Sequence, residues 1–301
     1  MFRYYLKLGM LSIRANPALS ALMVAAIGIG IGACMTIMTI QHVMSGNPIP
    51  QKSDSLYYVQ VDSWSPDSPY DGTNELPDQL TYLDATGIEA AAGDDFRVAW
   101  SYKSSRILQP GDGADLPFEI STRATSYRFF SLFALPFRYG AGWEAASDQN
   151  REQVVVLSSA LNERLFGGEN SVGESVTMNG DIYRVVGVLE PWLPVPKFYD
   201  VTNNPYDEPE EAYLPVTVAV AAEHDSQGNT NCWKPFPGGY EAFLNSECIW
   251  FQMWAELPTA ADKSRFEQLL AAYVEEQKAL GRFPREMRNE LSDVMEWMRD
   301  N

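Results

Sequence analysis

The chain has 301 residues, and its 22 Lys and Arg against 40 Asp and Glu give a formal net charge of −18. Nucleic acid is therefore excluded as a partner of the main body, because both are negatively charged and repel each other. The charge is unevenly distributed, since residues 1–45 carry only Arg3, Lys7 and Arg14, and the first acidic residue is Asp54.

Residues 1–17 form the first predicted element. At a helical period Arg3, Lys7 and Arg14 fall on one face, which predicts an amphipathic helix lying on the cytoplasmic surface of a membrane and contacting lipid headgroups. Pro17 disfavours helical geometry at the residue before it and ends this helix. A disordered basic start is the alternative.

The run Ala18–Ile40 is 23 residues long and contains no charged residue. About 20 apolar residues are enough for a helix to cross a bilayer, so residues 18–44 are predicted to be a transmembrane helix. The basic flank stays in the cytoplasm by the positive-inside rule, which puts residues 46–301 outside. The alternatives are a cleaved signal peptide and a lipoprotein processed at Cys34, but secretory apolar regions are shorter, about 7–15 residues.

Gly28 and Gly32 have the spacing that lets two transmembrane helices approach closely, so they are predicted to pack against another helix. The alternative is that they have no such role. A nucleotide-binding loop at Gly28, Gly30 and Gly32 is excluded because no strand precedes them.

The exported region begins with short elements. Ser55–Val61 alternates apolar and polar residues, which predicts a strand. Pro77–Ala85 is expected to be a short helix. Phe96–Ser101 and Phe118–Ala124 are expected to be strands, separated by a turn at Pro110–Gly113.

The middle of the chain has the clearest local signals. Gln153–Leu157 is a predicted buried strand, Ser158 or Ser159 is suited to cap a helix through Phe166, and Gly167 is suited to end it.

A predicted hairpin follows, with strands Glu174–Met178 and Tyr183–Leu189. Its turn, Asn179-Gly180, contains residues that tolerate the positive φ angles of a tight turn. Pro191–Glu211 is expected to be an irregular loop.

The last segment is predicted to be a strand and two helices. Ile249–Leu257 alternates as a strand, Thr259 and Asp262 are suited to cap the next helix, and Gly281 is suited to end it. A final helix is expected after Pro284, aligning Met287, Leu291, Val294, Met295 and Met298. Strands mixed with helices predict an α+β fold.

Cys232 and Cys248 lie 16 residues apart in the exported region and are a disulfide candidate. Free thiols are one alternative. Zinc is the other, but it is disfavoured because the sequence has no C-x-x-C motif.

The densest acidic cluster comprises Asp207, Glu208, Glu210 and Glu211, and it is expected to be a solvated loop rather than a site for calcium or for a basic partner. The aromatic segment Trp233–Tyr240 either packs on itself or docks on a partner.

Catalytic signals are weak. His42 and His224 are the two histidines, and no serine or cysteine lies in a nucleophile motif such as G-x-S-x-G. The chain is therefore expected not to be an enzyme and to need no metal or cofactor.

Three consecutive segments carry a family resemblance: SYRFFSLFALPFRYGAGW (126–143), QVVVLSSALNERLFGG (153–168) and VGESVTMNGDIYRVVGVL (172–189). In their order and spacing they resemble the periplasmic core domain of MacB-type ABC transporter permeases. The resemblance implies an inner-membrane subunit of a bacterial transporter. Its periplasmic domain would be moved by ATP hydrolysis in a separate ATP-binding subunit, driving export or efflux mechanically.

The implied partners are that ATP-binding subunit, a second permease copy, and in some systems a periplasmic adaptor protein with an outer-membrane channel. The resemblance also implies that residues 46–301 form two subdomains, one interrupting the other, with Ser55–Val61 beside the segments after Ile249.

Family permeases have three further spans after this domain, and the sequence has no apolar run after Ile40 that could supply them. As written, the chain is expected to present the exported domain without coupling it to the ATPase. The alternative function is a single-span, membrane-anchored binding or sensor module.

Overall fold

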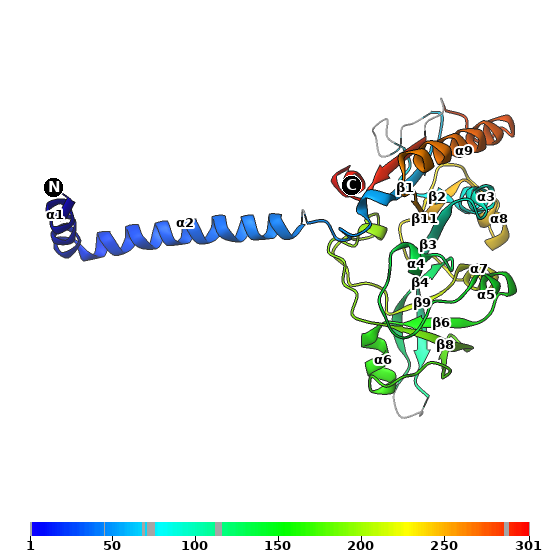
Figure 1. Ribbon diagram of the computed structural model, residues 1–301, viewed down its shortest axis with the longest axis horizontal. Coiled ribbons are helices and arrows are strands. Elements are labelled where there is room, and N and C mark those ends of the chain that lie inside the picture. The colour runs from blue at the N-terminus through cyan, green and yellow to red at the C-terminus, as the bar shows by residue number, and fades with distance from the viewer. Residues whose placement is uncertain are drawn as a thin grey trace. The chain divides into compact units, whose positions relative to one another are not determined.

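The computed structural model describes residues 2–44, 46–67, 70, 76–111, 116–285 and 289–300 (Figure 1). The chain divides into two compact units, Met1–Gly46 and Asn47–Asn301.

The first unit consists of two helices, α1 (Phe2–Ala15) and α2 (Pro17–Met44). Pro17 is the first residue of α2, a position where its missing N–H costs no hydrogen bond. Within α2, Pro17–Thr39 has a mean hydropathy of 2.2 and is long and apolar enough to cross a membrane. Arg14 is exposed, whereas the side chains of Arg3 and Lys7 lie outside the described residues.

The second unit mixes strands and helices around one extended sheet. Its strands are β1 (Leu56–Val61), β2 (Leu80–Thr81), β3 (Arg97–Gln109), β4 (Phe118–Thr125), β5 (Phe137–Gly140), β6 (Val154–Leu157), β7 (Ser175–Met178), β8 (Asp181–Leu189), β9 (Ala212–Pro215), β10 (Asn231–Cys232), β11 (Cys248–Glu256) and β12 (Asn289–Asp293). Its helices are η1 (Ser53–Ser55), α3 (Tyr82–Ala92), α4 (Phe129–Leu132), α5 (Ala145–Asn150), α6 (Ser159–Phe166), η2 (Phe198–Asp200), α7 (Val216–Ala221), α8 (Tyr240–Leu244), α9 (Ala260–Ala279) and α10 (Val294–Asp300).

The sheet has the strand order β12-β1-β11-β3-β4-β9-β6-β8-β5. Strand β7 pairs with both β3 and β8, so β3, β4, β9, β6, β8 and β7 form a closed circuit of hydrogen-bonded neighbours, which we call the strand ring. Strands β1 and β11 lie with α9 towards one end of the unit, and β6, β8 and α6 lie towards the other (Figure 1).

The predicted local signals of the middle segment are confirmed. Ser158 accepts a hydrogen bond from the backbone N–H of Leu161 and caps α6, which ends at Gly167 with φ 61°. Asn179 and Gly180 have φ values of 51° and 94° and form the turn between β7 and β8.

Strand β1 pairs with both β11 and β12. The family resemblance implied this position for Ser55–Val61, beside the segments after Ile249. Thr259 caps α9 by accepting from the N–H of Asp262 at 3.1 Å. The buried face of α9 includes Phe266, Leu270 and Tyr273, at helical spacing.

Two predicted elements are wrong. The expected helix at Pro77–Ala85 begins later, at Tyr82, because Thr81 caps it and Leu80 instead pairs with β11. The expected final helix is a strand, β12, followed by the short helix α10. Leu291 lies in β12 opposite Val59, and this pairing across the sheet outweighs the helical spacing of the methionines. Met287 lies outside the described residues.

The predicted strand Phe96–Ser101 continues to Gln109, and the expected turn at Pro110–Gly113 lies partly outside the described residues. The interior of the unit contains three apolar clusters. One lies between the sheet and helices α3 and α9, a second contains the aromatic residues of α4 and η2, and the third fills the strand ring.

Candidate functional site

The glycines of the apolar helix α2 have free space beside them. An added Cβ at Gly28 or Gly32 would meet no atom within 4 Å. Thr36 and Thr39 donate their hydroxyl hydrogens to the carbonyls of Gly32 and Met35, at 2.9 and 2.8 Å. These two hydroxyls are therefore satisfied within the helix, and the space beside Gly28 and Gly32 is open.

The acidic cluster of the 191–211 loop is not wholly solvated, which corrects the sequence interpretation. Asp207 and Glu208 are exposed, but Glu210 is buried with its side chain against Arg123. Arg123 Nη2 donates to Glu210 Oε1 at 2.7 Å and also to Asp200. Tyr199 Oη donates to the second oxygen of Glu210 at 2.9 Å.

Lys197 completes this buried ionic cluster. Its Nζ lies 3.4 Å from Glu210 Oε1 and 3.6 Å from Asp200 Oδ2, so two cations face two carboxylates. Burial alone would raise the pKa of Glu210, but Arg123 and Lys197 outweigh it and lower that pKa to about 2. Burial raises the pKa of Asp200, and Arg123 opposes this. The cluster fastens the 191–211 loop to β4, which carries Arg123.

A groove of about 470 Å³ lies between α3 and α5. Glu89 of α3, Asp148 of α5 and Arg128 are among its lining residues. Asp148 accepts from the backbone N–H of Tyr127 at 2.7 Å and from the indole N–H of Trp143 at 2.9 Å. Burial nevertheless raises the pKa of Asp148 to about 7, because it outweighs these two hydrogen bonds. Burial also raises the pKa of Glu89.

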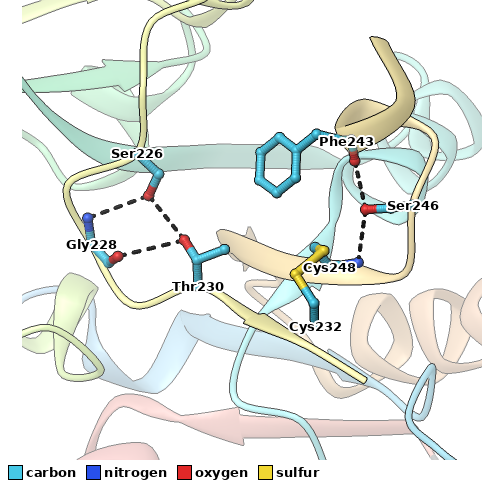
Figure 2. Close-up of a disulfide and its surroundings, with 7 residues drawn as sticks. All are labelled: Ser226, Gly228, Thr230, Cys232, Phe243, Ser246 and Cys248. Carbon is cyan, nitrogen blue, oxygen red and sulfur yellow. Dashed lines mark hydrogen bonds between the residues drawn. A yellow bond between two sulfur atoms is a disulfide. The ribbon is translucent and has the colours of Figure 1, made fainter. Parts of the chain in front are cut away.

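Cys232 and Cys248 form a disulfide, with Cα atoms 4.1 Å apart, where β10 pairs with β11 (Figure 2). Ser246 accepts from the N–H of Cys248 at 3.2 Å and donates to the carbonyl of Phe243 at 2.6 Å, so the turn entering β11 is fixed (Figure 2).

The aromatic segment between the cysteines packs partly on the domain itself. The indole of Trp233 donates to the carbonyl of Ser63 at 2.9 Å, and the rings of Phe236 and Phe243 lie 5.8 Å apart. Phe236 remains 36% exposed.

The two histidines differ in how the structure describes them. His224 is buried, and burial together with the nearby Arg106 lowers its pKa to about 3, so it is neutral. The side chain of His42 lies outside the described residues. Among the residues that the structure describes, no group of three or more His, Cys, Asp or Glu side chains is arranged to hold a metal ion.

Sequence reasoning missed the buried partners of Glu210. Arg123 lies between Thr122 and Ala124 on β4, where a charged side chain is expected to be exposed, whereas its buried partner Asp200 follows 77 residues later. The sequence of β4 mixes polar and apolar residues, so it contains no local signal that Arg123 is buried.

A family model described as the MacB-like periplasmic core domain matches residues 20–273. The chain belongs to this family. The resemblance found in the sequence is thereby confirmed, together with the α+β fold and its N-terminal apolar helix, and the chain falls among the periplasmic domains of ABC-type transporter permeases.

Curated relatives include the macrolide export ATP-binding/permease protein MacB of Salmonella paratyphi A (strain ATCC 9150 / SARB42) and that of Salmonella typhi. Each is 23% identical over 194 residues, which cover 63% of this chain and 28% of the relative. The match thus spans little more than a quarter of those relatives' length.

Similar solved structures include the periplasmic region of MacB from Actinobacillus actinomycetemcomitans, with a TM-score of 0.48 and 14% identity, covering 82% of this chain and 92% of that one. The extracellular domain of the noncanonic ABC-type transporter YknZ from Gram-positive bacteria also has a TM-score of 0.48 and 14% identity, covering 79% and 100%.

Proposed function

We propose that this chain is the anchored periplasmic part of a permease subunit in a MacB-type ABC transporter. ATP hydrolysis in a separate ATP-binding subunit moves the periplasmic domain, and this movement drives export or efflux. The observation that supports this proposal is the family match across residues 20–273, which includes most of the apolar helix and most of the exported domain.

The membrane arrangement follows from charge. Arg3, Lys7 and Arg14 stay with the anionic headgroups of the cytoplasmic leaflet, α2 crosses the inner membrane, and residues 46–301 lie in the periplasm. The acidic periplasmic domain is repelled by anionic lipid, which favours its projection away from the bilayer.

Pairing of two permease copies is the second part of the proposal. The open face at Gly28 and Gly32 supports close packing of α2 against another transmembrane helix. A periplasmic adaptor protein and an outer-membrane channel are further partners of the same proposal. The chain is not proposed to be an enzyme, because its sequence has no G-x-x-x-x-G-K-[ST] phosphate loop and ATP hydrolysis needs the other subunit.

One spin label per permease copy tests pairing and motion together. Glu119 is exposed on β4, so E119C in a C34S background carries the label without disturbing the interior. The proteoliposomes hold the whole permease subunit, of which this chain is proposed to be a part, together with its ATP-binding subunit. A label-to-label distance between copies is expected, and it is expected to shift during ATP hydrolysis.

A second label position at Glu267, exposed on α9, separates motion of the domain from local motion of β4. Absence of any distance between copies would contradict pairing. Distances that stay the same with and without ATP at both positions would contradict the mechanical role, and so would ATP hydrolysis by this chain alone.

A further inference from the structure

The strand ring has a charged residue inside it. Along β3, Tyr102, Ser104, Arg106 and Leu108 alternate with more exposed residues and are all buried. In the register with β4, Arg106 lies opposite Ile120, and Leu108 and Ile120 both belong to the apolar cluster that fills the ring. Arg106 therefore lies on the buried face of β3 that borders this apolar cluster.

This guanidinium has no counter-ion within the described residues. Arg106 is 8% exposed, and its one hydrogen bond is a long one, from Nη2 to Ser104 Oγ at 3.5 Å. Its Nε–H is buried without an acceptor. A buried charge without compensation is expensive, and burial accordingly lowers the pKa of Arg106.

Three further polar groups on the same side of the sheet are buried without partners: Thr122 Oγ1, Tyr183 Oη and His224 Nδ1. Thr122 lies opposite Ser104 on β4, and Tyr183 comes from β8 and belongs to the cluster inside the ring. The charge of Arg106 acts on the pKa of both Tyr183 and His224, so these side chains lie within electrostatic range of it.

The segment after α7, which contains His224, is hydrogen-bonded to side chains of β3. The carbonyl of His224 accepts from Tyr102 Oη at 3.1 Å, and the carbonyl of Asp225 accepts from Ser104 Oγ at 2.9 Å. Asp181 and Asp225 are the carboxylates that influence the pKa of Arg106, and neither forms an ion pair with it. Unpartnered polar groups thus lie near Arg106, and no described carboxylate is close enough to form an ion pair with it.

We infer that a small anion binds inside the strand ring against Arg106, with the hydroxyls of Thr122 and Tyr183 and the imidazole N–H of His224 as further donors. A chloride or a small oxyanion accepts hydrogen bonds without donating any, and it also supplies the missing negative charge. Water would satisfy the donors but leave the cation uncompensated. This site is independent of the proposed transport role.

Thermal unfolding of the full chain in detergent micelles tests this inference. Sodium chloride and sodium phosphate are each titrated at constant ionic strength, which sodium gluconate maintains because its anion is much larger than chloride or phosphate. A saturable rise in Tm with either small anion is expected for the wild-type protein. Chloride binding is read directly from the line width of the ³⁵Cl NMR signal, and phosphate binding by calorimetry.

Arg106→Gln and Arg184→Gln are a matched pair. Both remove one positive charge, but Arg184 lies next to Tyr183 on β8 with its side chain 56% exposed. R184Q is expected to respond to anions as the wild type does, whereas R106Q is expected to lose the response. At low anion concentration R106Q is also expected to unfold at the same or a higher temperature than the wild type, because it no longer buries an uncompensated cation.

Tyr183→Phe keeps the aromatic side chain in the apolar cluster and removes one hydrogen-bond donor. It is therefore expected to weaken anion binding roughly threefold to tenfold. The inference is overturned if Tm depends only on ionic strength, if R106Q and R184Q respond equally, or if R106Q is destabilised at every anion concentration. The last result would show that Arg106 is satisfied by the protein itself.

Discussion

Arg123 neutralises two carboxylates, Asp200 and Glu210, where the three side chains are at most 1% exposed. Replacing Arg123 by Met leaves Lys197 as the one remaining cation beside them among the residues that the structure describes. We expect R123M to lower the free energy of unfolding by about 3–5 kcal/mol, because an uncompensated buried charge remains. Urea denaturation of the full chain measures this loss.

The matched control for that prediction is R184M. Its guanidinium is exposed and lies 3.9 Å from Glu152, so the change is expected to cost less than about 1 kcal/mol. Equal effects of R123M and R184M would show that the buried ionic cluster does not hold the 191–211 loop.

Asp148 gives a prediction of pH dependence. Its carboxyl has a pKa of about 7 in the folded domain, against an ordinary value of 3.8, because of burial. Between these values the folded state keeps a proton that the unfolded state has released, so the free energy of unfolding falls as pH rises through this window. D148N removes the titration. The stability of the wild type relative to D148N is therefore expected to fall from pH 4 to 7.5.

The size of this relative loss is about 1.4 kcal/mol for each unit by which the pKa is raised. Denaturation at several pH values measures the slope, which is informative even if the D148N substitution alters the absolute stability by removing one acceptor. Parallel pH profiles of wild type and D148N would contradict the raised pKa.

At the scale of elements, strands and helices with local determinants could be predicted from the sequence. The Ser158 cap, the Asn179-Gly180 turn and the alternation of β11 each depend on neighbouring residues only. β12 could not be predicted in this way, because its partner β1 lies more than 200 residues earlier and the methionine spacing also fits a helix.

The same reasoning applies to the buried sites. The disulfide candidate could be named because the exported region contains two cysteines, Cys232 and Cys248. The pairing of Arg123 with Glu210 depends on a loop distant in the sequence. The position of Arg106 opposite Ile120 depends on the register between β3 and β4. Sequence alone places neither charge inside the protein.

The disulfide joins strands β10 and β11. Closing a loop with a sequence separation of 16 is expected to contribute about 3 kcal/mol, so the C232S/C248S double variant should lose about that much. The unreduced protein, unfolded and alkylated, is expected to gain one label by mass spectrometry, at Cys34, and three after reduction. Three labels without reduction would contradict the disulfide.

At the scale of the whole molecule, the two units differ in the sign of their charge. Residues 1–45 are basic and apolar, while all 40 acidic residues lie beyond them. The proposed topology follows from this contrast. The division of residues 46–301 into two subdomains remains a prediction, which a measurement of independent unfolding would test.

Cysteine labelling tests the topology. In a C34S background, M10C lies on α1 and E119C on β4, and both native residues are exposed. In intact spheroplasts a membrane-impermeant maleimide is expected to label E119C and not M10C, because α2 separates the two positions. After the membrane is opened both should react.

The same M10C protein distinguishes a retained span from a cleaved signal peptide, since cleavage would remove position 10 from the mature chain. Labelling of M10C in intact spheroplasts would contradict a cytoplasmic N-terminus, and its absence from the mature protein would replace the anchor with a processed leader.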